Sequence, residues 1–361
     1  MRTSFDEFLV ETEGASAATD SAPCVMGVRV RLARNLAGTP FPDWANDARR
    51  REAAEKIADA AGRLPEFADA FRFDTAANAT ERTFLIERRL ISPDLQGAGS
   101  GAIVSRSRDV SLMLNEEDHL RLQVFAPTDD FGDAWAKARA LDKALAEKLD
   151  FAFSEKYGFL TACPTNAGTG LRISVMLHLP GFVMEGQTEK ILRALDAVGL
   201  AARGFRGEGS ETNGCVFQIS NRHTLGVSEA ETLALMRRWT RGIVEQELAA
   251  RRRVFARERE RLADRIARAY GMLRFAVALS MEESLELISL LRAACDARFF
   301  PTGTRERLDE LSVETGTAHL ACRAKFRGEP CDESRENLLR GRLFRETLSA
   351  VRPPDFSDFL N

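Results

Sequence analysis

The sequence predicts an α+β protein in which an antiparallel sheet with helices is followed by an all-helical region. Two observations lead to this prediction. Residues 102–126 and 171–179 contain runs in which apolar and polar side chains alternate, which is the period of a half-buried strand. Near residues 245–255 the composition shifts, and the chain after it is highly charged with helical spacing. We therefore expect a boundary between a sheet-containing domain and a helical one.

The composition sets limits on the function. The chain has 361 residues, of which 44% are hydrophobic and 29% charged, as in an ordinary globular protein. Its net charge of -3 gives no general attraction to nucleic acid or to an anionic membrane. No apolar run approaches the ~20 residues that span a bilayer, and the N-terminus lacks a signal-peptide pattern. The six cysteines include no C-x-x-C pair. We expect a reduced, cytoplasmic protein without nucleic-acid or membrane partners.

The first part of the chain places two arginines side by side. Residues 1–24 are small and polar, which predicts a flexible N-terminal arm. Residues 27–35 form an extended segment with Arg29 and Arg31 on one face and apolar residues on the other. Two adjacent guanidinium groups repel unless an anion lies between them. The alternative is a solvated edge strand with charged residues that prevent edge pairing.

A charged turn joins two of the predicted strands, 109–115 and 120–126. Residues 115–121 hold three consecutive carboxylates, a histidine and Arg121, where small turn residues are the usual choice. The alternative is a solvated charged turn. A helix is expected over residues 131–156. Its first residues, Asp-Phe-Gly, match the magnesium-binding triplet of protein kinases, but the accompanying kinase motifs are absent, so we interpret them as a helix entry.

A loop around Cys163 precedes the strand at 171–179. Pro164 restricts Cys163 to an extended conformation, and two glycines follow within the loop. A lone cysteine is usually a buried structural residue, and that interpretation stays open here. The polar face of the strand carries Arg172 and His178. No second histidine or cysteine lies at metal-ligand spacing, so His178 is expected to be a packing group and no metal site is predicted.

The next segments alternate helix and strand. We expect a helix over 182–197, a strand over 200–205 and a strand around 215–219, with a glycine-rich charged loop at 203–211 between the strands. By itself this loop is a flexible turn. Capping boxes at 228–231 and 280–283 predict the starts of two helices.

Acidic, thiol and guanidinium groups thus gather in one predicted domain. No phosphate-binding P-loop motif is present, yet clustered arginines suit a triphosphate and carboxylates suit a planar guanidinium group. In phosphoryl transfer, positioning and charge neutralisation supply most of the rate. The groups are the carboxylates of Glu117 and Glu208, the thiol of Cys163, and the guanidinium groups of Arg29, Arg31, Arg121, Arg172 and Arg203.

Five segments resemble the ATP:guanidino phosphotransferase (phosphagen kinase) superfamily, in the family's order. They are Arg-Val-Arg-Leu-Ala-Arg-Asn at 29–35, Asn-Glu-Glu-Asp-His-Leu-Arg at 115–121, Leu-Thr-Ala-Cys-Pro-Thr-Asn with Gly-Thr-Gly-Leu-Arg at 160–172, Arg-Gly-Phe-Arg-Gly-Glu at 203–208 and Ile-Ser-Asn at 219–221. The resemblance implies a catalytic domain at 25–250, built as a large antiparallel sheet flanked by helices. It also implies that Glu117 and Glu208 hold the guanidine, that Cys163 is the reactive cysteine, and that the five arginines hold the phosphates of ATP, bridged by Mg²⁺.

The layout resembles one branch of this superfamily. Small-molecule members carry a helical domain before the first motif, whereas here that motif begins at Arg29 and a helical domain, 251–361, follows. The chain is similar in this respect to bacterial protein-arginine kinases. This implies transfer of the γ-phosphate of ATP to exposed arginine side chains of proteins, which marks them for Clp-type degradation. The partners implied are protein substrates, a Clp unfoldase-protease and an activator protein, and a homodimer is kept open.

The chain departs from the family pattern at two places, and two alternative functions are kept. Arg89 stands where the family has histidine, and the phosphoarginine-sensing motif near the C-terminus is not intact, its nearest match being residues 335–341. One alternative is a kinase of free arginine or another small guanidine. The other is a non-catalytic adaptor that binds arginine or phosphoarginine on proteins.

Overall fold

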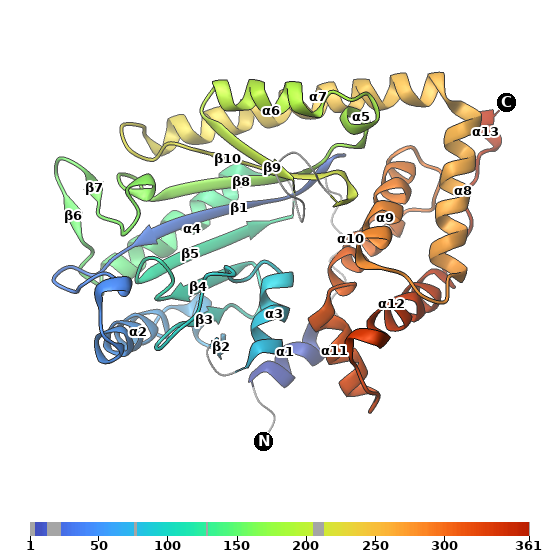
Figure 1. The fold of residues 1–361 in the computed structure, drawn as a ribbon. Coiled ribbons are helices and arrows are strands. Elements are labelled where there is room, and N and C mark those ends of the chain that lie inside the picture. Colours follow the sequence, from blue (N-terminus) through green and yellow to red (C-terminus); the bar gives the residue numbers. More distant parts are fainter. Residues whose placement is uncertain (1–3, 13–22, 76–77, 128, 205–212, 361) are drawn as a thin grey trace. The chain divides into compact units, whose positions relative to one another are not determined.

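The computed structural model describes residues 4–12, 23–75, 78–127, 129–204 and 213–360 (Figure 1). The chain divides into two compact units. The first comprises residues 1–15, 27–175 and 220–239, and the second comprises residues 16–26, 176–219 and 240–361. Of the predicted site residues, Glu208 alone lies outside the residues that the structure describes.

An eight-stranded sheet has the order β2-β3-β4-β5-β1-β8-β10-β9, and its pairings from β2 to β1 are antiparallel (Figure 1). With the helices, this sheet confirms the predicted α+β class. The strands are β1 (Val25–Arg34), β2 (Phe71–Asp74), β3 (Gly101–Val104), β4 (Val110–Leu114), β5 (Leu120–Ala126), β8 (Leu171–His178), β9 (Leu200–Gly204) and β10 (Val216–Asn221), with β6 (Phe153–Ser154) and β7 (Gly158–Phe159) forming a separate hairpin.

Helices accompany the sheet, and every described element after α7 is a helix, as predicted for the C-terminal part. The helices are α1 (Ser4–Thr12), α2 (Asp47–Ala61), α3 (Ala79–Glu87), α4 (Phe131–Ala146), α5 (Pro180–Met184), α6 (Thr188–Ala197), α7 (Glu229–Arg257), α8 (Arg259–Phe275), α9 (Met281–Asp296), α10 (Thr304–Glu314), α11 (Thr317–Phe326), α12 (Glu333–Leu348) and α13 (Ser357–Leu360). The predicted capping boxes open α7 and α9, where Ser228 and Ser280 accept from the N–H groups of Glu231 and Glu283 at 3.2 and 3.1 Å.

The two faces of β1 differ in polarity, as its alternation predicts. Val28, Val30 and Leu32 are buried. Arg34 lies on this same face and donates to Asp142 of α4 at 2.8 Å, so α4 covers the apolar face. The odd-numbered residues of β1 therefore project from the opposite face of the sheet.

Three segments differ from the sequence-based expectation, and one of them is the helix expected over 182–197, which is divided into α5 and α6. The helix expected over 131–156 ends at Ala146, and the hairpin β6–β7 follows, in which the rings of Phe153 and Phe159 pack 5.3 Å apart. The start of α4 is as predicted, because the side chain of Asp130 accepts from the first N–H groups of the helix. Within the segment expected to be an arm, α1 buries Phe8 against Phe71, with ring centroids 5.0 Å apart.

His178 is a packing group, as predicted. It is fully buried in the second unit, and its Nε2 lies 2.7 Å from the hydroxyl of Ser289. Its Nδ1 accepts from Arg292 at 3.1 Å and lies 3.3 Å from Arg251. Burial, followed by the charges of Arg292 and Arg251, lowers the pKa of His178 well below its usual range. The imidazole is therefore neutral and joins β8 to α7 and α9.

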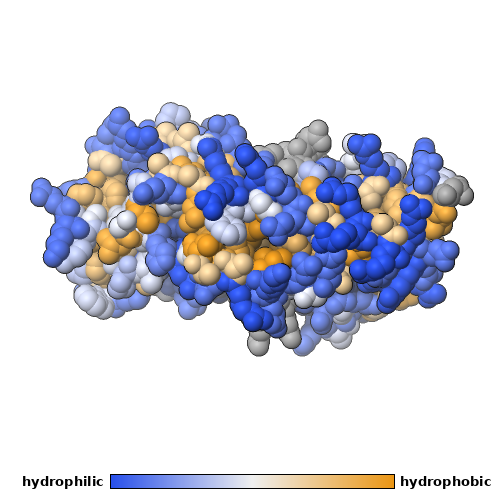
Figure 2. Space-filling view, turned by 90° about the horizontal axis from the view of Figure 1, so that it is seen from above, coloured by the Kyte–Doolittle hydropathy of each residue, from blue (hydrophilic) through white to orange (hydrophobic). Residues whose placement is uncertain are grey.

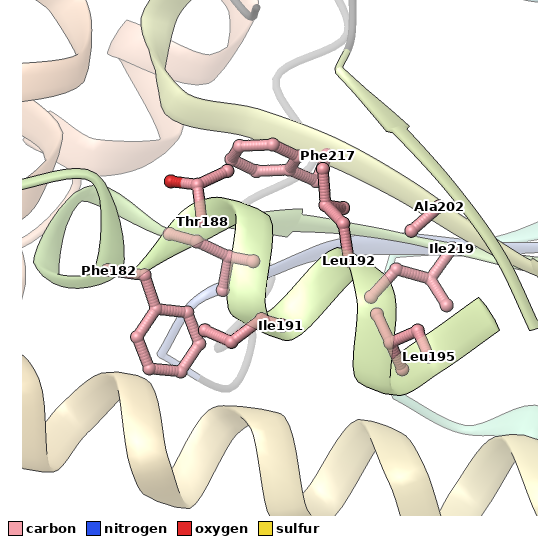
Figure 3. Close-up of a pocket in the computed structure, with 9 residues that line it drawn as sticks. Phe182, Thr188, Ile191, Leu192, Leu195, Ala202, Phe217 and Ile219 are labelled. Carbon is pink, nitrogen blue, oxygen red and sulfur yellow. The ribbon is translucent and has the colours of Figure 1, made fainter. Parts of the chain in front are cut away.

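Figure 2 shows a mainly hydrophilic surface on which hydrophobic residues form scattered patches. A small apolar pocket lies between α6 and strands β9 and β10 (Figure 3). Ile191, Leu192 and Leu195 of α6 face Phe217 and Ile219 of β10 across it. It contains none of the predicted site residues. Among the described residues, no helix has both the length and the apolar character needed to cross a membrane.

The two arginines of the altered C-terminal motif have different environments. Arg340 is buried on α12, where it donates to the carbonyl oxygens of Thr315 and Leu279 at 3.0 and 2.9 Å. Arg335 lies one turn earlier, and its side chain is exposed. Arg340 therefore joins three parts of the helical region through its guanidinium group, and Arg335 does not.

We expect Arg340→Ala to lower the free energy of unfolding by about 2–4 kcal/mol, because two buried carbonyl groups lose their donor and a cavity forms. Arg335→Ala, the matched control, should change it by less than about 0.5 kcal/mol. Urea denaturation followed by circular dichroism measures both values. Equal losses in the two variants would contradict this assignment.

Candidate active site

Three of the predicted phosphate-binding arginines lie on one face of the sheet, contributed by β1 and β5. Arg31 is directly opposite Gln123 in the antiparallel pair β1–β5. Residues opposite each other in such a pair project from the same face, and so do residues two positions apart in one strand. Arg29, Arg31, Arg121 and Gln123 therefore share the polar face. The contact between Arg29 Nη1 and Gln123 Oε1, at 3.5 Å, agrees with this placement.

Arg172 of β8 extends this polar face on the other side of β1. Arg29 Nε donates to the hydroxyl of Ser174 at 3.5 Å, which places Ser174 on the polar face. Arg172 lies two residues earlier in the same strand and therefore projects from the same face. Its Nη2 contacts the hydroxyl of Ser220 in β10 at 3.5 Å. Four arginines from three neighbouring strands thus gather on one surface.

The electrostatics at Arg31 reflect this crowding. Burial, followed by repulsion from Arg29, Arg172 and Arg121, lowers the pKa of Arg31 well below its usual range, and Glu116 acts in the opposite direction. The Nε atom of Arg31 is buried and has no hydrogen-bond partner among the described residues. A bound polyanion would supply both an acceptor and the missing negative charge.

Glu117 lies in the turn between β4 and β5, beside this cationic face. Its Oε2 accepts from Arg121 Nη2 at 2.9 Å and from the side-chain amide of Asn166 at 3.3 Å. The neighbouring Glu116 is nearly fully buried and accepts from Arg121 Nη1 at 2.6 Å. In the described part of the chain no group donates to Oε1 of Glu117, and the side chain is 34% exposed. The carboxylate can therefore accept a further guanidinium group.

Asp118 ties the turn to the loop that carries Cys163. It is buried, and its Oδ1 accepts from the side-chain amide of Asn35 at 2.6 Å and from the backbone N–H of Ala162 at 2.7 Å. Burial raises the pKa of Asp118, and these two donors oppose the shift. Because Asn35 ends the motif in β1, one carboxylate fixes three separate segments together.

His119 fixes the same turn to the segment after β1. Its Nδ1 accepts from the backbone N–H of Leu36 at 3.2 Å, and its Nε2 lies 2.9 Å from the carbonyl oxygen of Pro40. These two contacts require a neutral ring with the proton on Nε2. Burial lowers the pKa of His119 and favours this neutral form. The histidine is therefore part of the scaffold that positions Glu117.

Cys163 is half-buried at the start of a short 3-10 helix, Pro164–Asn166. Its Sγ lies 3.0 Å from the hydroxyl of Thr165, and its carbonyl oxygen accepts from the hydroxyl of Thr161 at 2.7 Å. Gly168 follows with a positive φ of 99°, and a Cβ there would come within 2.4 Å of the carbonyl oxygen of Thr224. Only glycine allows the loop to approach so closely.

The loop with Cys163 and the turn with Glu117 are thus neighbours, joined by the Ala162–Asp118 and Asn166–Glu117 hydrogen bonds. Arg203 lies in β9 of the second unit, where its side chain is exposed. Glu208 lies outside the described residues. The residues that the first unit brings together are Glu117, Cys163, Arg29, Arg31, Arg121 and Arg172.

Sequence reasoning missed the amides and the acid that position these groups. Besides Asn35 and Asp118, buried Asn221 accepts from the N–H of Ile173 at 2.7 Å and donates to the carbonyl oxygen of Leu171 at 3.0 Å, which fixes β8. The sequence signal that could have identified these residues is a polar side chain at a strand end. Asn35 directly follows β1, and Asn221 is the last residue of β10.

We expect Asp118→Ala to lower the free energy of unfolding by about 2–4 kcal/mol, because the buried donors of Asn35 and Ala162 lose their acceptor. Asp118→Asn keeps an acceptor oxygen and should cost less than half as much. Urea denaturation of both variants measures the difference. Equal losses would show that Asp118 does not join these segments.

A comparison of wild type with Asp118→Asn tests the pKa shift of Asp118. Because the pKa is raised on folding, folded wild type binds this proton more tightly than the unfolded chain does. Its stabilising effect is complete at low pH and is lost as pH rises from the usual aspartate pKa through the raised value. Asp118→Asn lacks this proton, so its stability relative to wild type should increase over that range.

Comparisons with known proteins identify the family and the fold. The family model of the ATP:guanido phosphotransferase C-terminal catalytic domain matches residues 53–250, and that of the protein-arginine kinase McsB C-terminal domain matches residues 259–358. A lombricine kinase crystal structure is similar in fold, with a TM-score of 0.56 and 23% identity over 68% of this chain and 76% of that chain.

Curated relatives match over nearly the whole chain. A protein-arginine kinase of Halothermothrix orenii is 38% identical over 90% of this chain and 93% of the relative. One of Moorella thermoacetica is 40% identical over 91% of this chain and 95% of the relative. These matches confirm the resemblance seen in the motifs. The chain belongs to the ATP:guanido phosphotransferase family and, within it, to the bacterial protein-arginine kinases.

Proposed function

We propose that this protein transfers the γ-phosphate of ATP to arginine side chains of proteins. The observation that carries the proposal is the position of Glu117, a partly exposed carboxylate that already accepts a guanidinium group, beside a sheet face with four arginines. In the reaction a guanidinium nitrogen forms a bond to the γ-phosphorus, the bond from that phosphorus to the bridging oxygen breaks, and ADP leaves. The acceptor nitrogen loses a proton.

The arginines are proposed to hold the nucleotide. Arg29, Arg31, Arg121 and Arg172 would bind phosphate oxygens from the polar face, and Arg203 would join them. The lowered pKa of Arg31 supports a polyanionic ligand, and so does its buried Nε, which has no partner in the described part of the chain, since phosphates would relieve the repulsion and accept the hydrogen bond.

Magnesium is proposed to enter with the nucleotide. Mg²⁺ in proteins is commonly held by substrate phosphate oxygens together with few protein ligands. Bound there, Mg²⁺ would neutralise charge on the phosphates. The arginine face then orients the nucleotide and excludes water from it.

Glu117, Glu208 and Cys163 are proposed to hold the acceptor guanidinium. Arg121 shows that Glu117 can accept this group, at 2.9 Å. One of the two carboxylates would accept the proton released as the N–P bond forms. Burial raises the pKa of the Cys24 and Cys295 thiols to about 12 and so disfavours a thiolate at either of them. A role for Cys163 beside the guanidinium is consistent with its half-buried position.

The wider setting is part of the same proposal. We assign residues 25–250 to catalysis and 251–361 to a helical domain, a division supported by the limits of the two family matches. The motif resemblance extends the proposal to a cytoplasmic enzyme that marks proteins for Clp-type degradation, with an activator protein. The resemblance is also compatible with a homodimer.

Glu117→Gln tests the activity. We expect wild type with ATP, Mg²⁺ and an arginine-rich protein to give acid-labile phosphate on arginine, detected by mass spectrometry. Glu117→Gln should reduce the rate at least about 100-fold, because the amide neither holds the guanidinium charge nor accepts its proton. Cys163→Ser and Glu208→Gln should also be impaired.

Glu52→Gln, an exposed acid on α2, is the matched control and should keep the wild-type rate. Labelling that survives Glu117→Gln unchanged would rule out the proposed role. Turnover of free arginine with none on protein would favour a small-guanidine kinase. Nucleotide binding without transfer would favour an adaptor.

A further inference from the structure

Exposed hydrophobic side chains of the first unit are not spread evenly over it. The large ones that are exposed in its described residues are Trp44, Phe153, Tyr157 and Leu225, with exposed fractions of 82, 59, 47 and 52%. Single exposed hydrophobic residues are common and need no explanation. These four, however, belong to three loops, and each loop is hydrogen-bonded to the Glu117 turn or to the Cys163 loop.

The first loop follows β1 and carries Trp44. It is fixed to the Glu117 turn by His119, which accepts from the N–H of Leu36 and contacts the carbonyl oxygen of Pro40 at 2.9 Å. A short 3-10 helix, Pro42–Trp44, then presents the indole, whose ring centroid lies 6.1 Å from that of Phe41. Trp44 is therefore an exposed aromatic residue on a loop that is hydrogen-bonded to His119, the second residue after Glu117.

The second loop is the hairpin β6–β7, which carries Phe153 and Tyr157. Phe159 of this hairpin exchanges two backbone hydrogen bonds with Gly168, at 2.8 and 3.2 Å, so the hairpin pairs with the end of the Cys163 loop. Phe153 packs its ring on Phe159 but stays largely exposed.

The third loop follows β10 and carries Leu225. Its neighbour Thr224 donates through its hydroxyl to the carbonyl oxygens of Thr165 and Ala167 at 2.8 and 2.7 Å. The backbone carbonyl of Thr224 also accepts from the N–H of Thr169 at 3.0 Å. The loop that carries Leu225 is thus also fixed to the Cys163 loop.

We propose that Trp44, Phe153, Tyr157 and Leu225 form an apolar rim that binds the substrate polypeptide on either side of the target arginine. The inference rests on the proposed function and names the substrates it favours, namely arginines flanked by apolar or aromatic side chains. Trp44 is the principal contact, because it has the largest exposed aromatic surface of the four. The rim residues are specificity-determining and take no part in the chemistry.

A polypeptide fits this rim better than a free amino acid does. The guanidinium group of the acceptor would lie at Glu117, and the backbone of an arginine in a protein would extend outward from it toward the surrounding loops. Neighbouring side chains would then cover the exposed rings and remove apolar surface from water. Free arginine has no such neighbours. The anchored loops would present these rings without a large ordering cost on binding.

Two peptides of equal length with one arginine each test the rim, one with leucine and phenylalanine beside the arginine and one with serine at those positions. We expect wild type to have a kcat/KM about 10-fold or more higher for the apolar peptide, the discrimination that burial of one or two such side chains gives. In Trp44→Ala the ratio of the two values should fall toward one, with the KM for ATP unchanged.

Phe275→Ala is the matched control, since Phe275 is 68% exposed and belongs to none of the three loops, and it should keep the wild-type ratio. A ratio that is unchanged in Trp44→Ala would overturn the rim proposal. A raised KM for ATP would instead assign Trp44 to nucleotide stacking, and a changed oligomeric state would assign it to contact between copies. If wild type phosphorylates neither peptide nor any protein, the proposed function itself fails.

Discussion

Repulsion among guanidinium groups is the physical constraint on which the rest of the site depends. The alternating pattern of β1 and the registers of β5 and β8 bring Arg29, Arg31, Arg121 and Arg172 onto one face of the sheet. Such crowding destabilises the folded protein, and Glu116 and Glu117 both pair with Arg121. Under the proposed function, the phosphate chain of the nucleotide would offset the repulsion among the four arginines. The sheet would then hold the arginines in place before the nucleotide binds.

The acceptor side of the site depends on a different device, a set of buried polar residues. Asp118 receives donors from β1 and from the Cys163 loop, and His119 holds the segment after β1. These contacts fix the turn of Glu117 without using Glu117 itself, and no group among the described residues donates to its carboxylate oxygen Oε1. His119 also anchors the loop that carries Trp44, and the Cys163 loop anchors the hairpin β6–β7 and the loop of Leu225. On the proposal above, these contacts connect the acceptor site to the substrate polypeptide.

Local patterns in the sequence predicted much of this architecture. Alternation identified the strands, and the capping boxes at Ser228 and Ser280 identified the helix starts, because both signals depend on neighbouring residues. The hairpin β6–β7 and the roles of Asp118 and Arg340 depend on contacts between distant segments, which periodicity does not contain. Motif resemblance supplied the family and gathered the site residues. For Arg203 and Glu208 their convergence with the other site residues stays a prediction.

Nucleotide binding by Arg31→Gln tests the central claim most directly. The measurement is isothermal titration of ATP with Mg²⁺ in the absence of an acceptor, and the account predicts that the variant binds ATP at least about 10-fold more weakly than wild type. A tenfold change in affinity corresponds to about 1.4 kcal/mol, and a buried charge-assisted hydrogen bond contributes more than that. Arg49→Gln, which removes an exposed arginine of α2, should bind as wild type does. An Arg31→Gln variant with wild-type affinity for ATP would contradict the account.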